Sequence, residues 1–353
     1  MRVTSSDGAS GDPGMPDGLA AVFIVPPGRP PSGGDLYNAF LLRALDAEGF
    51  RVETTTLAGL VPGAYPPRTE FWADSLYIPA LAAADPFGPD DRLFFIIHSL
   101  PSVDPGIAGE QAGELRKAED RLFARASGFV VTGPDTVDVL KERGFAGRPI
   151  LIVPPAPCVL PKGPPVAPGV FTGLIVSSLI RGKGVPDFLD ALGREVRETD
   201  DIAVRIAGRT DIEPETASAC LGAVAAHPIL RKRVVHLGFL PCEELGGEYE
   251  RSSVLIGPSH GETFGMAFHE ARAFGLPILA LRAAYSEPFI EPGRNGFLFD
   301  SEAELARGTV DLARRPGRLR DLAAAAVRSR PAVSYTWAEA ARSFLRQRIR
   351  HHL

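Results

Sequence analysis

The sequence has few cysteines and no long apolar run, and these absences exclude several classes of protein. Its 353 residues include three cysteines, Cys158, Cys220 and Cys242, which lie far apart and show no C-x-x-C or Cys/His ligand spacing. A disulfide framework and a structural zinc site are therefore not expected. No apolar run approaches the ~18–20 residues of a membrane span, so no transmembrane segment is predicted.

The chain also lacks a large excess of charge of either sign. Lysine and arginine total 38 against 43 acidic residues, which gives a net charge of −5. This balance argues against a nucleic-acid partner or a surface that coats anionic membranes. Arginines at 342, 346, 348 and 350 lie near the end of a predicted helix, where cations complement the helix dipole. Peripheral membrane contact is the alternative interpretation of that cluster, and the oligomeric state is left open.

Residues 1–19 have no apolar segment of the kind that a secretion signal needs, and we expect a flexible leader or an over-extended start. A cytoplasmic, reducing location is predicted. With 45% hydrophobic and 23% charged residues the chain can bury real cores. Its 37 glycines and 33 prolines stay below the roughly 25–30% that marks low-complexity chains, so their excess needs a local explanation.

From residue 20 the chain alternates between short apolar runs and helical patterns. Continuous apolar strands that alternate with helices predict a parallel sheet covered on both faces. The strands expected in the first half are Ala21–Val25, Arg51–Thr55, Leu93–Ile97, Phe129–Thr132 and Ile150–Val153, with helices at Asp35–Glu48, Glu70–Ala83, Gly109–Arg125 and Asp135–Arg143. In the second half they are Val170–Ser177, Ile202–Ala207, Val234–Leu237, Val254–Ile256 and Ile278–Leu281, with helices at Val185–Arg197, Pro214–Ala226, Glu243–Arg251, Phe264–Phe274 and Glu302–Arg314, and only helix after Pro316.

A proline-rich segment separates the two halves. Seven of the 33 prolines fall within residues 154–168, where they favour an extended, semi-rigid connector. The expected organisation is a leader at 1–19, a Rossmann-like domain at 20–155, a linker at 156–168, a second domain at 169–334 and a helix at 335–353 that crosses back to the first domain. Two doubly wound α/β domains that face a central cleft, with ligands at the carboxyl ends of their strands, are the predicted architecture.

The most informative stretch, residues 257–277, follows an apolar strand and opens a helix. Because a helix N-terminus presents unpaired N–H groups, the backbone of Thr263, Phe264 and Gly265 could bind a diphosphate. Glu262 and Glu270 would lie about 12 Å apart along that helix, which is about the separation of the sugar and the ribose in a nucleotide-sugar. The alternative is that Glu262 is a capping acid and Glu270 a solvated helix position.

A second candidate is the basic turn after the strand at 170–177. Lys183 could neutralise a diphosphate, most strongly as the leaving group gains charge, and Arg181 lies in the same turn. A solvated surface lysine is the alternative.

In the first half, Gly33 and Gly34 enter a helix whose N-terminus is expected at the strand ends, although a Gly-Gly pair is often just a turn. His98 ends the strand Leu93–Ile97 and could hydrogen-bond a sugar hydroxyl or the acceptor, or be a plain polar loop residue.

These motifs together resemble the retaining glycosyltransferases of family 4, the glycosyl transferases group 1, which have the GT-B fold. Glu262 and Glu270 match the E-x7-E motif of that family, and Lys183 matches its lysine. Flanking segments resemble the family as well, namely Val234–Leu240 with its base-binding turn, Asn295–Phe299, Gly33-Gly34 as a "GG-x-x-Y" loop, and His98 as an "H-x-p" segment. The resemblance covers about residues 20–347. It departs at Ser178, where most members have arginine; Arg181 is a possible compensation.

The resemblance implies a hexosyl transfer with retention from a nucleotide-diphosphate-sugar, as co-substrate, to a hydroxyl acceptor. Residues about 169–330 would bind the donor and 20–155 the acceptor. Glu262, Lys183 and His98 would be catalytic. The donor-binding residues would be Gly33, Gly34, Arg181, Phe239, Leu240, Thr263, Phe264, Gly265 and Glu270. No Asp-x-Asp pair follows a strand in a donor-binding context, so neither a cofactor nor an obligatory metal is expected.

Two other functions stay open at this point. One is a non-catalytic binder of nucleotide-sugars, which the serine at 178 motivates, and the other is a nucleotide-sugar epimerase on the same scaffold. A Rossmann dehydrogenase is disfavoured because no G-x-G-x-x-G follows the first strand. The donor sugar, its base and the acceptor are not specified by these motifs.

Overall fold

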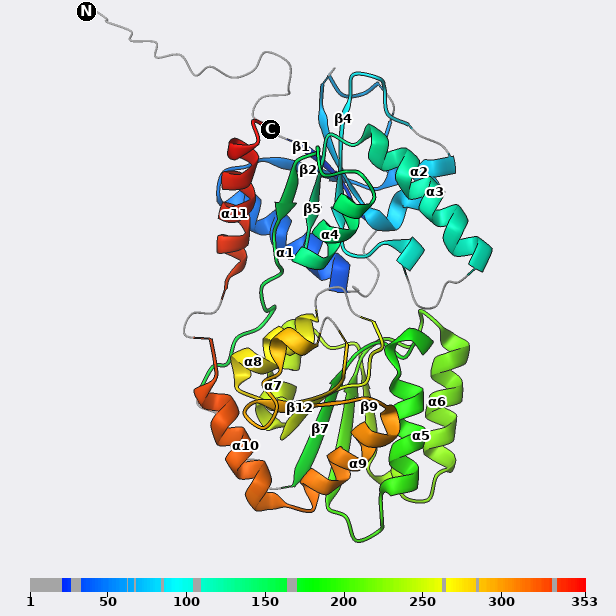
Figure 1. The fold of residues 1–353 in the computed structure, drawn as a ribbon, viewed down its shortest axis with the longest axis vertical. Coiled ribbons are helices and arrows are strands. Elements are labelled where there is room, and N and C mark those ends of the chain that lie inside the picture. Colours follow the sequence, from blue (N-terminus) through cyan, green and yellow to red (C-terminus); the bar gives the residue numbers. More distant parts are fainter. Residues whose placement is uncertain are drawn as a thin grey trace, which may run out of the picture. The chain divides into compact units, whose positions relative to one another are not determined.

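The computed structural model divides the chain into two compact units (Figure 1). The residues that it describes are 21–26, 33–61, 63–66, 68–83, 86–103, 109–163, 170–261, 265–283, 286–331 and 335–353. Unit 1 comprises described residues up to Val103, Gly109–Pro154 and Trp337–Leu353, and unit 2 those within Pro155–Thr336. The division falls between Pro154 and Pro155, at the start of the proline-rich segment, and the described residues of that segment from Pro155 on belong to unit 2.

Unit 1 is a six-stranded parallel sheet in the order β2-β1-β3-β4-β5-β6. Its strands are β1 Ala21–Ile24, β2 Val52–Thr55, β3 Glu70–Asp74, β4 Arg92–Ile97, β5 Gly128–Val131 and β6 Ile150–Ile152. Its helices are α1 Gly33–Ala47, α2 Ile78–Ala83, α3 Gly109–Arg125, α4 Pro134–Glu142 and α11 Trp337–Arg350. The C-terminal helix α11 packs on α1 and on β6. Its Phe344 meets the fully buried Trp72 of β3, which stacks on Phe94 of β4 with ring centroids 4.2 Å apart.

One predicted element of unit 1 is wrong. The helix expected at Glu70–Ala83 is a buried strand, β3, followed by a 3₁₀ turn and the short helix α2. All five residues of β3 are buried, and its register pairs Phe71, Trp72 and Ala73 with both neighbouring strands. Aromatic side chains pack well on a pleated surface covered on both faces, and that packing outweighs the helical spacing of the polar residues.

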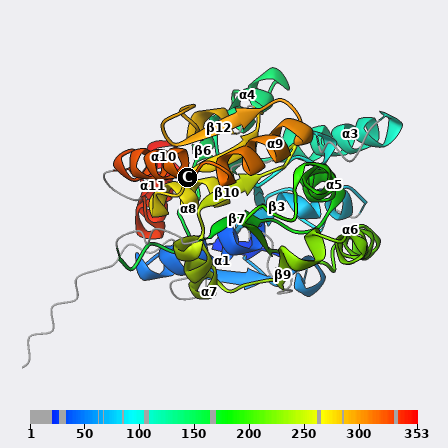
Figure 2. The same ribbon diagram turned by 90° about the horizontal axis from the view of Figure 1, so that it is seen from below.

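Unit 2 is a second six-stranded parallel sheet, in the order β12-β11-β10-β7-β8-β9. Its strands are β7 Phe171–Val176, β8 Ile202–Ala207, β9 Val234–Gly238, β10 Val254–Gly257, β11 Ile278–Leu281 and β12 Gly296–Phe299. Its helices are α5 Val185–Glu195, α6 Pro214–Ala226, α7 Cys242–Arg251, α8 Met266–Phe274, α9 Glu302–Ala313 and α10 Pro316–Arg328. Helix α5 packs against α6 and α9 over one apolar core, and α7 and α8 share the other core (Figure 2).

The strand order reverses once in each sheet, and these switch points position the candidate sites. In unit 1 the reversal lies between β1 and β3, and in unit 2 it lies between β7 and β10. In an open α/β sheet the segments that follow such strands leave in opposite directions, which opens a crevice at the carboxyl ends where ligands bind.

The cysteines correct a second expectation. Cys158, in the connector, and Cys242, the first residue of α7, form a disulfide with their Cα atoms 5.8 Å apart. They are 84 residues apart in sequence, so only the packing of the connector on unit 2 brings them together. Cys220 is buried and free of any disulfide. Within the described part of the chain, no helix combines the length and the apolar character needed to cross a membrane.

Candidate functional site

Two turns of unit 2 meet at its switch point. After β7 the chain forms the 3₁₀ turn Arg181–Lys183, which ends at Gly184 with φ +63°. A Cβ built on Gly184 would lie 2.1 Å from the carbonyl oxygen of Pro258, which follows β10. A side chain at position 184 would therefore clash with the backbone and strain its own. Lys183 Nζ lies 3.4 Å from the carbonyl oxygen of Gly261, so Lys183 contacts the residue immediately before Glu262.

The neighbouring cations lie differently. The side chain of Arg181 is exposed, and its backbone N–H donates to Glu213 Oε2 at 3.0 Å. Arg209, which follows β8, is a cation that the sequence analysis did not single out. Its backbone carbonyl accepts from the N–H of Leu179, the residue after Ser178, and its largely buried guanidinium pairs with Asp211 at 2.8 Å.

The helix that carries Glu270 begins later than the sequence predicts. Helix α8 starts at Met266, with Gly265 as its N-cap in the left-handed conformation, φ +69°. The separation of about 12 Å expected between Glu262 and Glu270 required one continuous helix over both residues. Because α8 begins only at Met266, that expectation does not hold. Glu262, Thr263 and Phe264 lie outside the described residues.

Glu270 is buried, with 2% of its surface exposed, which rules out the solvated helix position. Its Oε2 accepts from the Tyr249 hydroxyl at 2.7 Å, and its Oε1 accepts from the N–H of Cys158 at 3.1 Å. Burial raises the pKa of the Glu270 carboxyl to about 7, although these two hydrogen bonds lower it. Tyr249 and the disulfide-bonded Cys158 thus hold this carboxyl, and neither contact is visible in the local sequence.

Phe239 and Leu240 follow β9 and are half-buried. The strand ends at Gly238 in the left-handed conformation, φ +74°, and the Gly238 carbonyl accepts from the N–H of Gly208 after β8. The predicted base-binding turn is therefore fixed at the carboxyl end of the same sheet that carries Lys183.

In unit 1, the structure brings the Gly-Gly pair and His98 together. Gly33 and Gly34 are the first residues of α1, and a Cβ on Gly34 would lie 3.1 Å from Cδ2 of His98. His98 follows β4, and its Nε2 lies 3.0 Å from Asn38 Oδ1 and 3.3 Å from Asp74 Oδ2. Asn38 and Asp74 were not predicted as site residues, because they belong to other elements, α1 and the end of β3.

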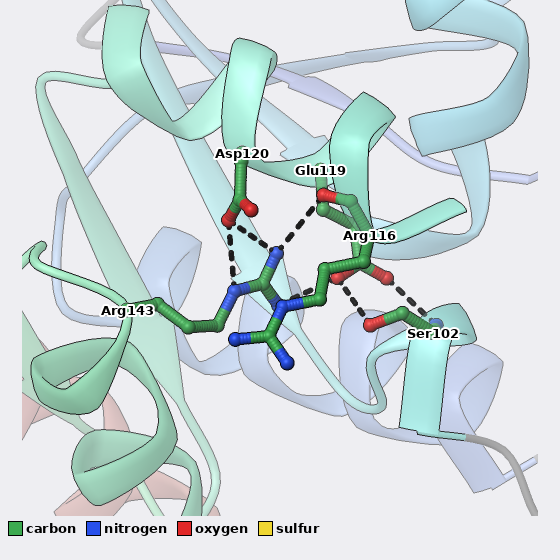
Figure 3. Close-up of polar contacts among 5 residues, drawn as sticks. All are labelled: Ser102, Arg116, Glu119, Asp120 and Arg143. Atoms are coloured by element: carbon green, nitrogen blue, oxygen red, sulfur yellow. Dashed lines mark hydrogen bonds and ion pairs between the residues drawn. The ribbon is translucent and has the colours of Figure 1, made fainter. Parts of the chain in front are cut away.

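A buried ion cluster supports the turn that follows His98 (Figure 3). Arg143 and Glu119, whose side chains are 4% and 0% exposed, approach to 2.6 Å, and Arg143 also pairs with Asp120 at 2.6 Å. Glu119 accepts from the backbone N–H and the hydroxyl of Ser102, at 2.8 and 2.6 Å. Because Ser102 lies in the turn Pro101–Val103, this cluster fixes that turn to α3.

Among the described residues, one group of His, Cys, Asp or Glu side chains has the spacing of a metal site. Ligand atoms of Asp187, His260 and Glu302 lie within 4.8 Å of one another, and His260 Nε2 approaches Glu302 Oε1 to 2.6 Å. Asp187 and His260 are exposed, and the contact at 2.6 Å joins His260 to Glu302.

Comparisons with known proteins give these sites a context. The family model described as Glycosyl transferases group 1 matches residues 170–315. An alpha-monoglucosyldiacylglycerol synthase from Acholeplasma laidlawii is 25% identical over 146 residues, 41% of this chain and 35% of that protein. A D-inositol 3-phosphate glycosyltransferase from Streptomyces scabiei (strain 87.22) is 35% identical over 97 residues, 27% of this chain and 21% of that protein. The aligned part is thus between 21% and 35% of these relatives' length.

Solved structures match nearly the whole chain. A sucrose-phosphate synthase from Thermosynechococcus elongatus superposes with a TM-score of 0.73 at 19% identity, over 94% of this chain and 98% of that one. Anabaena HepE in complex with UDP and glucose gives 0.70 at 15% identity, over 93% and 98%. At these identities the likeness concerns the fold, which is GT-B. The predicted fold is confirmed, and the resemblance to group 1 glycosyl transferases is confirmed over residues 170–315.

Proposed function

We propose that this chain, whose residues 170–315 form a domain of the glycosyl transferases group 1 family, is a retaining glycosyltransferase. It would move a hexose from a nucleotide-diphosphate-sugar to a hydroxyl acceptor, without an obligatory metal. The observation that carries the proposal is the meeting of the Lys183 turn with the loop before Glu262 at the switch point of unit 2. The names of the relatives and the UDP in HepE support the donor class.

Each unit would take one substrate. Unit 2 would bind the donor, with the Gly238–Leu240 turn at the base, Glu270 at the ribose, and Lys183 at the diphosphate. A cation fixed beside the leaving diphosphate stabilises it most as its charge grows in the transition state. Unit 1 would bind the acceptor near His98. The cytoplasmic location stays a prediction.

Retention would follow from attack by the acceptor hydroxyl on the face of the donor sugar from which the leaving group departs. The leaving phosphate oxygen would take the proton of the acceptor hydroxyl while the new glycosidic bond forms, so no carboxylate nucleophile is needed. Glu262 would then orient the donor sugar, which distinguishes this site from the paired carboxylates of a glycosidase. Glu270, whose carboxyl is held by Tyr249 and the N–H of Cys158, would accept from the ribose hydroxyls.

The test is transfer by wild type, Glu262→Ala and Lys183→Ala with a panel of nucleotide-diphosphate-sugars and hydroxyl acceptors. Loss of a group that stabilises the transition state lowers kcat by about 10²–10³-fold, and we expect that loss in both variants. Lys232→Ala is the matched control, because Lys232 is an exposed lysine of unit 2 whose partner Glu198 is 3.7 Å away. Unchanged turnover in both site variants would refute the assignment.

The same assay separates the two other functions. Product analysis that finds a converted donor sugar without acceptor would indicate an epimerase. Binding of a nucleotide-sugar, seen as a thermal shift, with neither transfer nor hydrolysis would indicate a non-catalytic binder. A ligand at 100 times its dissociation constant stabilises the folded protein by about 2.7 kcal/mol, which a thermal shift detects readily.

A further inference from the structure

Three polar residues from three elements are packed together at the switch point of unit 1. Asn38 comes from α1, Asp74 ends β3, and His98 follows β4. Asp74 and Asn38 are 0% and 3% exposed, and the His98 side chain is 12% exposed. Buried polar groups of this kind are stable only if each finds its partners, so their arrangement is strongly constrained.

The hydrogen bonds of this cluster run in one direction. Asp74 Oδ1 accepts from the N–H of Leu76 at 2.8 Å, and its Oδ2 accepts from Asn38 Nδ2 at 2.6 Å. The amide of Asn38 is thereby oriented, because its nitrogen faces the carboxylate. Its Oδ1 faces His98 Nε2 at 3.0 Å, and Asp74 Oδ2 lies 3.3 Å from the same nitrogen. Both neighbours of Nε2 are acceptors, so Nε2 must carry a proton.

Other contacts hold the ring in place. Gly34 lies against the ring, and the ring of Tyr37 meets it in a T-shaped arrangement with centroids 4.9 Å apart. The backbone N–H of His98 donates to the hydroxyl of Ser75 at 3.3 Å. A ring held in this way keeps its nitrogens pointing in fixed directions. In the neutral imidazole a proton on Nε2 leaves the lone pair on Nδ1.

We propose that Asp74, acting through Asn38, is a positioning residue that fixes His98 as the Nε2–H tautomer, so that Nδ1 accepts a hydrogen bond from a hydroxyl of the acceptor. The functional half of this proposal rests on the proposed glycosyltransferase activity. The half that concerns the tautomer does not. A buried carboxylate that fixes the tautomer and orientation of an imidazole is an arrangement that proteins use where the second nitrogen contacts substrate.

Asp74→Asn tests the proposal because it reverses the network without changing its shape. Two donors, the N–H of Leu76 and Nδ2 of Asn38, would then face an amide that has one oxygen. Keeping the bond from Leu76 turns the new amide nitrogen toward Asn38, whose own amide must rotate to offer its oxygen. The nitrogen of Asn38 then faces His98, and Nε2 must accept a hydrogen bond. The expected result is a switch of His98 to the Nδ1–H tautomer.

The first measurement is the ¹⁵N NMR spectrum of the imidazole nitrogens, assigned with His98→Gln, in wild type and in Asp74→Asn. It is recorded at a pH high enough to keep the ring neutral. We expect Nε2–H in wild type and Nδ1–H in the variant, whereas a role limited to stability would leave the tautomer unchanged. Nδ1–H in wild type would overturn the proposal, and the wild-type result does not depend on whether Asp74→Asn folds.

The second measurement is steady-state kinetics with the acceptor and the donor varied separately. Replacing an accepting nitrogen by a donor costs one hydrogen bond in a partly buried site, so we expect the acceptor KM to rise about 10–100-fold. The donor KM should not change. Asp46→Asn is the matched control, because Asp46 is an exposed aspartate of the same unit on α1, and both KM values should stay at the wild-type level.

The two measurements separate the failure of this proposal from failure of the proposed function. If wild type transfers sugar and Asp74→Asn does so with unchanged acceptor KM, the positioning role is wrong although the function stands. If no donor is turned over while the tautomer switches as expected, the proposed function and the acceptor role fail together, and the tautomer assignment stands.

Discussion

Asp74 in unit 1 and Glu270 in unit 2 are both buried carboxyls, yet their surroundings favour opposite charge states. Burial raises the pKa of Asp74, but His98, the N–H of Leu76 and Asn38 more than offset it, and its pKa lies below the ordinary value. Burial also raises the pKa of Glu270, and there the hydroxyl of Tyr249 and the N–H of Cys158 leave it at about 7. Burial alone therefore does not set the charge of a carboxyl, because the imidazole and the hydrogen-bond donors around it also shift its pKa.

The two switch points also differ in how they are built. Unit 2 brings two turns together through the backbone, where Gly184 contacts the carbonyl of Pro258. Unit 1 brings α1, β3 and β4 together through the side chains of Asn38, Asp74 and His98. The first contact depends on a single glycine. The second depends on three side chains, each of which can be replaced separately by mutation.

The largest effect should come from the buried ion cluster of unit 1, at Arg143. Removing one partner of a buried ion pair leaves an uncompensated charge, so Arg143→Met should lower the free energy of unfolding by about 3–5 kcal/mol. Urea denaturation measures it. Lys141→Met, in the last turn of α4 just before Arg143, is the control, because its pair with Asp138 is exposed and such pairs contribute about 0–1 kcal/mol. Equal effects of the two changes would contradict the burial argument.

The next largest loss of stability is expected for Gly184→Ala, which disrupts the backbone contact between the two turns of unit 2. The added Cβ meets the Pro258 carbonyl at 2.1 Å in a left-handed conformation, so strain and overpacking together should cost about 3–4 kcal/mol. Gly182→Ala, two residues earlier in the same turn, is the control, because nothing lies within 4 Å of its Cβ. Urea denaturation again gives the stability, and an NDP titration by calorimetry should show weaker binding for Gly184→Ala alone. A stable variant with wild-type affinity would show that the two turns do not depend on this contact.

Much of the sheet structure follows from local sequence. Strands such as Ile202–Ala207 and Ile278–Leu281 lie at the predicted residues, because short apolar runs between helices have few alternatives in a parallel sheet. The errors have physical causes. Strand β3 was predicted as a helix because the burial of both its faces arises from tertiary packing, which the local sequence does not show. Strand β12 was not predicted, and only its first residue is buried in the structure.

The candidate sites were predictable to different degrees for the same reason. Lys183 and Glu270 lie on local motifs, one turn and one helix, and the structure describes both. Asn38 and Asp74 are 36 residues apart and His98 is another 24 further on, so no spacing in the sequence links them. The end of an apolar run by an aspartate, as in Glu70–Asp74, is the one signal that could have drawn attention to the cluster.

The smallest expected effect concerns the two buried carboxyls. It is the change in the pH dependence of the free energy of unfolding that Glu270→Gln should cause. Glu270 titrates near 4.5 when unfolded and near 7 when folded, so between these pH values the folded state holds one more proton than the unfolded state. Stability should therefore fall as pH rises through this window, by about 3 kcal/mol from this group. A glutamine can accept from Cys158 and donate to Tyr249, so Glu270→Gln should lose this slope while keeping the packing.

Urea denaturation at a series of pH values measures the difference between wild type and each variant. The difference should slope for Glu270→Gln and stay flat for the exposed control Glu244→Gln. The Asp74 carboxyl itself should contribute no slope across the same window. The depressed pKa of Asp74 gives a stability that is fully present above the ordinary carboxyl pKa and is lost only at more acid pH. Parallel curves for wild type and Glu270→Gln would mean that Glu270 is ionised in the folded state, and the contrast between the two buried carboxyls would then disappear.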